Sequence, residues 1–291
     1  IKASSLWLPP ERLPLVTAVL LSFGGLGGMA ATAPLQWTLD HVGWRYAFGG
    51  LAACALSVSL LIFTVVPEHP NKQNTSVRDM LHSIGQLYRS GLFWRMVLCT
   101  LFSNGAYMAI QGLWLGPWLR DVGHLSRPDV AQVLFFSTLA MVLGSLFFGW
   151  IADRLQRHGV RAITVCSVGM LGFLIVQGLM LVSNSVNPWA LAIGFSFFGT
   201  AGAMNYAILA QSVPKHLTGR ASTCFNLLIF VVAFALQWGL GIVINGWAPV
   251  DGSYPERAYL TAFGLSLAIQ CTGLVLCLSF KPWQLERAPS P

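Results

Sequence analysis

One short charged stretch, residues 149–161, holds the side chains most able to do chemistry. Between two long apolar runs it places one carboxylate, one histidine and three arginines, namely Asp153, Arg154, Arg157, His158 and Arg161. A carboxylate near a histidine can exchange protons, so an acid/base site is one interpretation. The simpler alternative is a charged loop anchored at lipid headgroups. Catalysis has no further support in the sequence, because no metal-spaced His or carboxylate cluster, nucleophile elbow, P-loop or Rossmann fingerprint is found.

A second candidate set is a stripe of amide and aromatic side chains within residues 96–119. Asn104, Tyr107, Gln111, Trp114 and Trp118 follow one another at spacings of three and four residues. This spacing puts them on one face of a helix. Such a face is unsuited to lipid, so it predicts contact with a cavity or with another helix.

Other apolar segments carry amides that are candidates for the same role. Asn226 and Gln237 lie eleven residues apart, which is about three helical turns, so they share a face. Asn205 lies in the middle of a further apolar segment. The alternative for each residue is a hydrogen bond between helices. The candidates for contact with a solute are Asn104, Tyr107, Gln111, Trp114, Asn205, Asn226 and Gln237.

Composition indicates that these side chains sit on membrane-spanning helices. Of the 291 residues, 55% are hydrophobic and only 9% are charged, whereas soluble domains carry about 25% charged residues. The chain has too little charge to cover a surface that faces water, which predicts an all-α integral membrane protein. The net charge of +7 is therefore assigned to cytoplasmic loops rather than to a nucleic-acid partner.

Runs without charge predict eight membrane spans, since one span needs about 20 apolar residues. A turn signal at residues 183–188 divides one uncharged run that is too long for a single span. The expected spans are 13–39, 46–66, 96–119, 130–152, and, with less definite limits, about 162–183, 189–213, 221–246 and 258–280.

The distribution of basic residues predicts the orientation of the spans. Lys and Arg divide 13 to 4 between the two sides, whereas Asp and Glu divide 5 to 5. By the positive-inside rule, both termini and residues 149–161 are expected to be cytoplasmic. The basic residues assigned to the opposite side are Arg45, Arg120, Arg127 and Arg257.

The polar stretch at residues 67–95 is predicted to contain one amphipathic helix. Val77, Met80, Ile84 and Leu87 recur at spacings of three and four, as on the apolar face of a surface helix. We interpret this stretch as a cytoplasmic linker between two groups of spans, with its helix on the membrane surface.

Three motifs resemble those of the major facilitator superfamily. Gly149-x-x-x-Asp153-Arg154, with Arg157 and Arg161 following, is similar to the family's loop signature G-x-x-x-D-R-x-G-R-R, although its Gly-Arg-Arg part is stretched. Gly43-Trp44-Arg45 with Phe48 resembles the family's G-W-R-x-x-F before its sixth helix. Residues 214–221, which end in Gly219-Arg220-Ala221, resemble the loop before the eleventh helix.

The resemblance implies that the chain corresponds to family helices five to twelve, with four helices preceding them. Residues 1–66 would then end an N-terminal bundle, 67–95 would link the bundles, 96–280 would form a complete C-terminal six-helix bundle, and 281–291 would be a cytoplasmic tail. Without the preceding helices, half of the wall of the central cavity would be missing.

The resemblance also implies the function of a secondary active transporter for a small organic solute in a bacterial inner membrane. Alternating access would require a gate, with Asp153 facing the start of span 13–39 near Arg12. The expected gating residues are Asp153, Arg154, Arg157, Arg161, Arg12, Arg45 and Arg220. No cofactor is expected, and the partners are the solute, the bilayer and a coupling ion such as a proton. The eight spans hold no ionisable Asp, Glu, Lys, Arg or His, so a coupling carboxylate would lie in the preceding helices. A transporter-like sensor that binds solute without flux is the main alternative, and a membrane enzyme is a weaker one.

Overall fold

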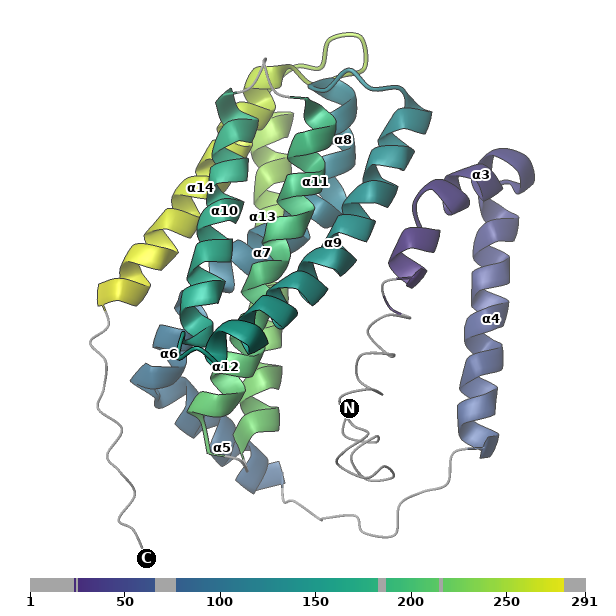
Figure 1. Ribbon diagram of the computed structural model, residues 1–291. Helices are drawn as coiled ribbons and strands as arrows, with labels where there is room; N and C mark the ends of the chain where they lie inside the picture. The colour runs from purple at the N-terminus through teal and green to yellow at the C-terminus, as the bar shows by residue number, and fades with distance from the viewer. Residues whose placement is uncertain (1–23, 25, 66–76, 183–186, 215–216, 280–291) are drawn as a thin grey trace, which may run out of the picture.

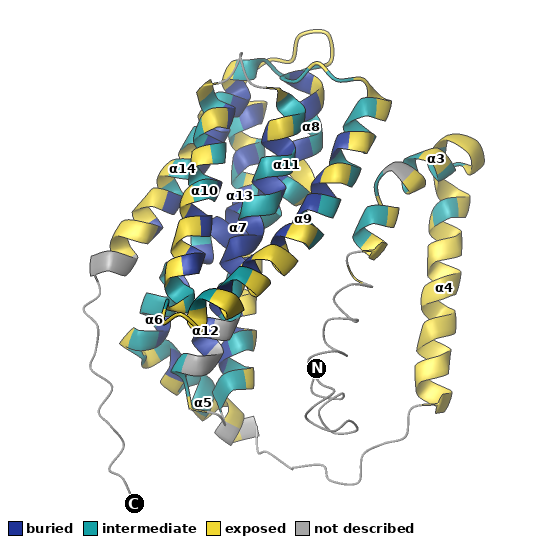
Figure 2. Ribbon diagram, viewed as in Figure 1, coloured by how far each residue is buried: buried dark blue, intermediate teal, exposed yellow. Residues whose placement is uncertain are grey.

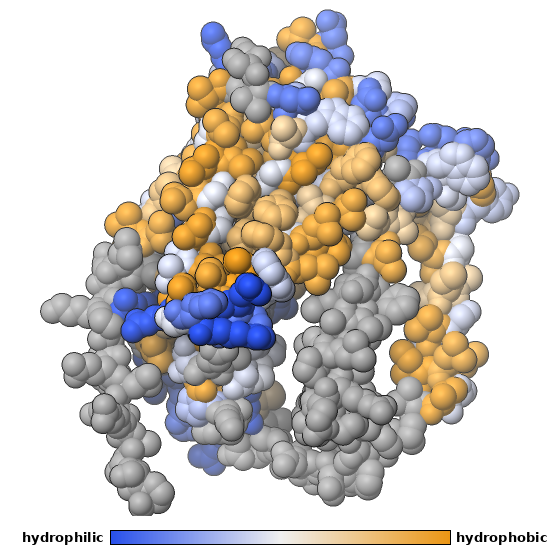
Figure 3. Space-filling view, viewed as in Figure 1, coloured by the Kyte–Doolittle hydropathy of each residue, from blue (hydrophilic) through white to orange (hydrophobic). Residues whose placement is uncertain are grey.

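A computed structural model describes the protein at residues 24, 26–65, 77–182, 187–214 and 217–279. All the named secondary-structure elements in these ranges are helices (Figure 1). A short bridge between Val250 and Ser253 is the one piece of β pairing in them. The all-α expectation is therefore confirmed. Apolar side chains cover the middle of the bundle, and polar side chains gather towards its two ends (Figure 3).

The first described elements form a hairpin of α3 (Ala33–Val42) and α4 (Trp44–Val65). They are joined by Gly43 alone, whose φ of 83° lies in the left-handed region that favours glycine. Arg45 lies over the ring of Trp44, 4.5 Å from its centroid. None of the residues of α4 is buried (Figure 2), and α3 packs against α9, where Gly28, just before α3, approaches Thr138.

Helix α5 (Val77–Arg89), which we call the linker helix because it lies in the predicted linker, packs against α6 and α13. Leu87 is buried in a cluster with Phe93 and Phe225, and Ile84 packs against the same cluster. Met80 remains exposed. A helix is therefore present where the sequence predicts an amphipathic one, and part of its apolar side faces protein. Its assignment to a cytoplasmic linker on the membrane surface stays a prediction. The side chain of Val77, the first of the four predicted apolar positions, lies outside the described residues.

The remaining helices form the bundle. In chain order they are α6 (Gly91–Leu98), α7 (Leu101–Ala109), the π-helix η2 (Ile110–Trp114), α8 (Leu115–Asp121), α9 (Arg127–Gln156), α10 (Ala162–Val182), α11 (Pro188–Gly199), the 3₁₀-helix η3 (Thr200–Ala203), α12 (Met204–Ser212), α13 (Thr218–Asn245) and α14 (Glu256–Ser279). We call the end that carries residues 122–126 and 246–255 the outer end, because the basic residues predict it to lie outside the cytoplasm. The end that carries residues 157–161 is the inner end.

Helix α9 is longer than the predicted span 130–152. Ser126 accepts a hydrogen bond from the backbone N–H of Asp129 and caps the helix, which continues to Gln156. Charged residues mark where a helix leaves the membrane, but they do not end the helix itself. A helix is ended by capping residues and by turns, and the turn that follows α9 is at Gly159, whose φ is 82°.

Two predicted spans of the bundle are interrupted helices, and the predicted span 13–39 has a turn at Ala31 and Thr32 before α3. Residues 91–121 bend by 40° between α6 and α7 and contain the π-helix, and residues 188–212 contain the 3₁₀ segment between α11 and α12. In the described ranges five helices are long and apolar enough to cross a membrane, or six if α6 to α8 count as one bent span. Residues 13–23 and 25 of the predicted span 13–39 lie outside these ranges, so the count of eight stays a prediction.

Candidate functional site

The charged turn at the inner end holds a local ion pair. Arg157 Nη2 lies 2.6 Å from Asp153 Oδ2, four residues earlier on α9. Both side chains are largely exposed, at 75% and 67%, so the pair contributes only about 0.3–0.5 kcal/mol to stability. Arg154 lies 5.9 Å from the ring centroid of Trp150. Residues 1–23, which include Arg12, are outside the described ranges, so the expected contact between Asp153 and the start of span 13–39 stays a prediction.

Asp153 also lines a cavity of about 340 Å³ at the inner end. The cavity lies between α9, the start of α10, and the interrupted helix at Thr200 and Met204. The carboxylate therefore adjoins a space next to a helix interruption. Arg161 is exposed at the start of α10.

Arg220 connects the linker helix to the bundle. Its Nη1 donates a hydrogen bond of 2.6 Å to Ser83 Oγ on α5. Because Arg220 lies in the first turn of α13, this contact joins two segments that are 137 residues apart in the sequence. It is a partner that the sequence did not reveal.

Two asparagines cross between the interrupted helices. Asn104 Nδ2 donates to the Gly202 carbonyl oxygen at 3.3 Å, and Asn205 Nδ2 donates to the Met96 carbonyl oxygen at 2.7 Å. Gly202 lies in η3, and Met96 lies in the last turn of α6, so each amide reaches an interruption in the other helix. A helix interruption leaves the regular backbone hydrogen bonding incomplete, and each amide supplies a further hydrogen bond there.

The rest of the predicted stripe also meets neighbouring helices. The Tyr107 ring packs on Gly199 and near Phe173 and Phe195. Gln111 Oε1 accepts a hydrogen bond of 2.7 Å from Ser196 Oγ. The stripe thus faces α10 and α11 over this part of its length.

Trp114 and Gln237 lie beside a groove on the bundle. Trp114 Nε1 donates to the Gln237 carbonyl oxygen at 3.1 Å, and both residues line a groove of about 380 Å³ between η2 and α13. Asn226 is exposed on α13 and accepts a hydrogen bond of 2.7 Å from the Tyr206 hydroxyl. Of the seven predicted solute-contacting residues, Trp114 and Gln237 line this groove and Asn226 is exposed. Tyr107 and Gln111 are only partly exposed, and Asn104 and Asn205 are buried. The role of all seven stays a prediction.

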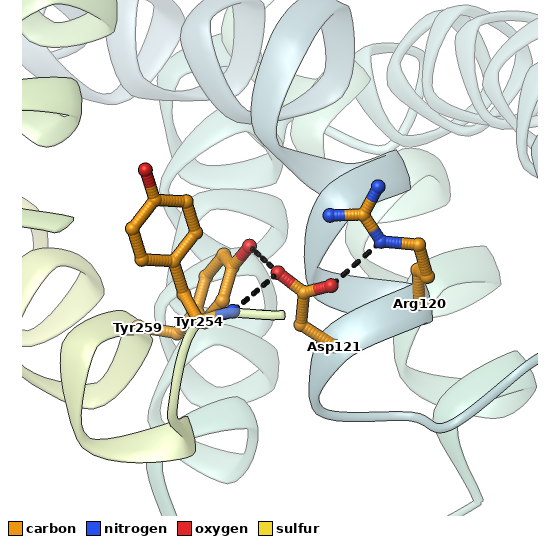
Figure 4. Close-up of polar contacts among 4 residues, drawn as sticks. All are labelled: Arg120, Asp121, Tyr254 and Tyr259. Carbon is orange, nitrogen blue, oxygen red and sulfur yellow. Dashed lines mark hydrogen bonds and ion pairs between the residues drawn. The ribbon is translucent and has the colours of Figure 1, made fainter. Parts of the chain in front are cut away.

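A buried carboxylate at the outer end was not singled out from the sequence (Figure 4). The Asp121 side chain is fully buried and accepts hydrogen bonds from Arg120 Nε at 2.6 Å, from the Tyr259 hydroxyl at 2.7 Å and from the Tyr254 backbone N–H at 3.2 Å. This cluster joins α8, the 246–255 connection and α14. The signal in the sequence is the pair of opposite charges at residues 120 and 121, directly after an apolar run.

Comparison with known sequences identifies the class of protein. The sequence pattern of the Major Facilitator Superfamily matches residues 1–237, and the chain belongs to this family. The resemblance drawn from the three motifs is therefore confirmed. The family is one of transporters rather than enzymes, so the acid/base interpretation of residues 149–161 is not supported.

Two relatives show how the chain compares in length. A probable sugar efflux transporter of Haemophilus influenzae is 28% identical over 188 residues, which cover 63% of this chain and 45% of that protein. A probable sulfoacetate transporter of Cupriavidus necator is 26% identical over 97% of this chain and 68% of that protein. The chain thus spans less than half the length of the first of these relatives.

A solved structure supports the fold. The chain is similar to a bacterial homologue of the human lysosomal transporter Spinster, in an inward-facing and unoccupied conformation, with a TM-score of 0.61 and 15% identity. The similarity covers 94% of this chain and 71% of that one. It concerns the helical arrangement of a multi-pass membrane protein.

Proposed function

We propose that the protein is a secondary active transporter that moves a small organic solute by alternating access. Its family and its relatives, a probable sugar efflux transporter and a probable sulfoacetate transporter, support this class of activity. The observation that carries the mechanism is the pair of interrupted helices joined by Asn104 and Asn205.

These helices hold equivalent places in the bundle. The first, α6 to α8, and the fourth, α11 to α12, begin the two successive groups of three spans in residues 91–279. Interrupted helices in corresponding positions of two repeats are the structural pointer to a transport site, because an interruption frees polar backbone groups and lets a helix bend. We place the hinge of the proposed motion at these interruptions.

The solute path follows from the accessible polar groups. Trp114 and Gln237 border the groove on α13, and Asn226 is exposed on the same helix. These residues are proposed to contact solute directly. Tyr107 and Gln111 are proposed to become accessible when α7 moves away from α11, and Asn104 and Asn205 are proposed to hold the interruptions.

The gate is proposed at the inner end. Asp153, with Arg154, Arg157 and Arg161 near it, would close against the start of span 13–39 at Arg12, while Arg45 at the outer end and Arg220 at the inner end would orient neighbouring segments. The weak, exposed pair of Asp153 with Arg157 supports this proposal, because little energy is needed to release the carboxylate.

The proposed setting is a bacterial inner membrane with both termini in the cytoplasm. The bacterial relatives and the excess of basic residues at the inner end support it. The proposed partners are the solute, the lipid bilayer and a coupling ion such as a proton. No cofactor is part of the proposal.

Flux into liposomes tests the proposed function. The full gene product, including any residues encoded before Ile1, would be reconstituted and given radiolabelled sugars or organic acids with and without a proton gradient. Saturable flux that follows the gradient is the expected result. Binding without flux would identify a sensor and overturn the carrier.

A further inference from the structure

A cavity at the outer end lies between the α3–α4 hairpin and the bundle. It has a volume of about 300 Å³ and is lined by residues of α8, of α9 and of the segment from Ala31 to Gln36. Its charged lining residues are Arg120 and Arg127, and among the described residues no carboxylate lines it. The cavity therefore presents two positive charges to any molecule that enters.

Arg120 is held in place by the buried carboxylate beside it. Its Nε donates to Asp121 Oδ1, while Tyr259 and the Tyr254 backbone occupy Oδ2. In Figure 4 the dashed line joins Asp121 to Nε, and no dashed line joins Asp121 to either terminal nitrogen of Arg120. The Arg120 side chain is 51% exposed. A guanidinium group that is oriented from one edge can offer its other donors to an anion.

Arg127 supplies the second charge from the first position of α9. Among the described residues it has no ion-pair partner. The nearest carboxylate along the chain, Asp129, is engaged with Ser126, whose Oγ donates to Asp129 Oδ2 at 2.5 Å. Asp40 on α3 accepts a hydrogen bond from Gln36. The local carboxylates thus have partners of their own, and Arg127 is available for a ligand.

The rest of the lining suits a small organic molecule. Val130, Ala131 and Leu134 give the cavity an apolar wall, while Thr32 and Gln36 add polar atoms on the opposite side. Ligand sites combine apolar walls with a few polar groups that orient the ligand, and the smallest have volumes of about 300 Å³. The size therefore fits a short-chain acid rather than a large solute.

We propose that this cavity binds a small organic dianion, with one carboxylate or sulfonate group at Arg120 and a second at Arg127. Because the cavity lies at the outer end, an anionic solute that enters from that end would bind here first. That role in transport rests on the proposed function, whereas the binding itself does not.

Isothermal titration of the full chain in phosphatidylcholine nanodiscs at low ionic strength tests the site. The probe is malonate, and malonamide is its neutral match in shape. Malonate is expected to bind saturably and malonamide at least tenfold more weakly. Equal binding of the two probes would overturn the proposal. Loss of malonate binding in nanodiscs of anionic phosphatidylglycerol would also overturn it, because the site would then belong to a lipid headgroup.

Variants locate the binding. Arg127→Gln is expected to weaken malonate binding about tenfold, because it removes one of two charge-assisted contacts. Arg120→Lys keeps the charge but loses the oriented guanidinium, and a similar loss is expected. Arg257→Gln is the control, since Arg257 is exposed on the first turn of α14 and does not line the cavity. Wild-type binding by Arg127→Gln would overturn the assignment, even if the full gene product carries out flux.

Discussion

Gln177 of α10 and Gln270 of α14 exchange two hydrogen bonds, each 2.9 Å long, between their side-chain amides. Both residues are almost completely buried, at 4% and 2% exposed. Each Nε2 donates to the other residue's Oε1. The two buried amides thus form hydrogen bonds with each other at a place that neither lipid nor water contacts. The pair joins two helices that the chain separates by 93 residues.

Replacing one glutamine of this pair is expected to be worse than replacing both. Gln177→Leu leaves Gln270 Oε1 without its donor, while Gln270 Nε2 keeps its contacts with Ser266. An unsatisfied buried acceptor costs about 1–3 kcal/mol, whereas the double change to leucine removes both polar groups together. Thermal unfolding in detergent measures the difference. A double variant whose loss equals the sum of the two single losses would contradict the reciprocal pair.

Asn205 is expected to affect the rate of transport more than the affinity for solute. Its amide bonds to the Met96 carbonyl at the α6–α7 bend, so Asn205→Leu should lower the maximal flux of the full gene product about tenfold with KM nearly unchanged. Thr272→Val is a matched control, because Thr272 is exposed and bonds only within α14. A change in KM alone would instead place Asn205 in contact with solute.

Asp153→Asn is expected to weaken the conformation that is closed at the inner end. The change keeps the shape of the side chain but removes the charge that the proposed gate requires. Spin-label distances across the inner end of the full gene product report the balance of conformers. Arg157→Gln is the comparison, since it removes the local ion-pair partner and leaves the carboxylate. If both variants behave alike, the local pair is what matters and the gate is excluded.

Gly199→Ala is expected to destabilise the bundle. A Cβ at this position would overlap the Tyr107 ring, and overpacking of this kind costs about 1–3 kcal/mol. Gly239→Ala is the control, because a Cβ there meets nothing within 4 Å. Melting temperatures of the two variants give the comparison, and equal values would refute the close contact between α7 and α11.

The sequence predicted the helices well because lipid imposes a simple pattern of long uncharged runs. The spans 46–66 and 221–246 correspond closely to α4 and α13. The interruptions left no such trace. The bend between Leu98 and Leu101 and the 3₁₀ turn at Thr200 lie inside continuous apolar runs. A carbonyl beside each accepts a hydrogen bond from an amide of the other helix.

The candidate site was predictable by residue type but not by partner. The spacing of Asn104, Tyr107 and Gln111 correctly indicated a shared face, while the identity of the facing helix came only from the fold. Asp121 was harder to recognise, because Tyr254 and Tyr259 lie more than 130 residues away. A carboxylate at the end of a span resembles an ordinary loop charge until those partners are known.

The exposed surface of α4 has a consequence for cooperativity. Its 22 residues include none that is buried, and within the described ranges the hairpin meets the bundle mainly through α3 and α9. Few shared contacts mean weak coupling between two folding units. The bundle should therefore keep its fold when the hairpin is displaced, and the apolar surface of α4 must be covered by lipid or by protein outside the described ranges.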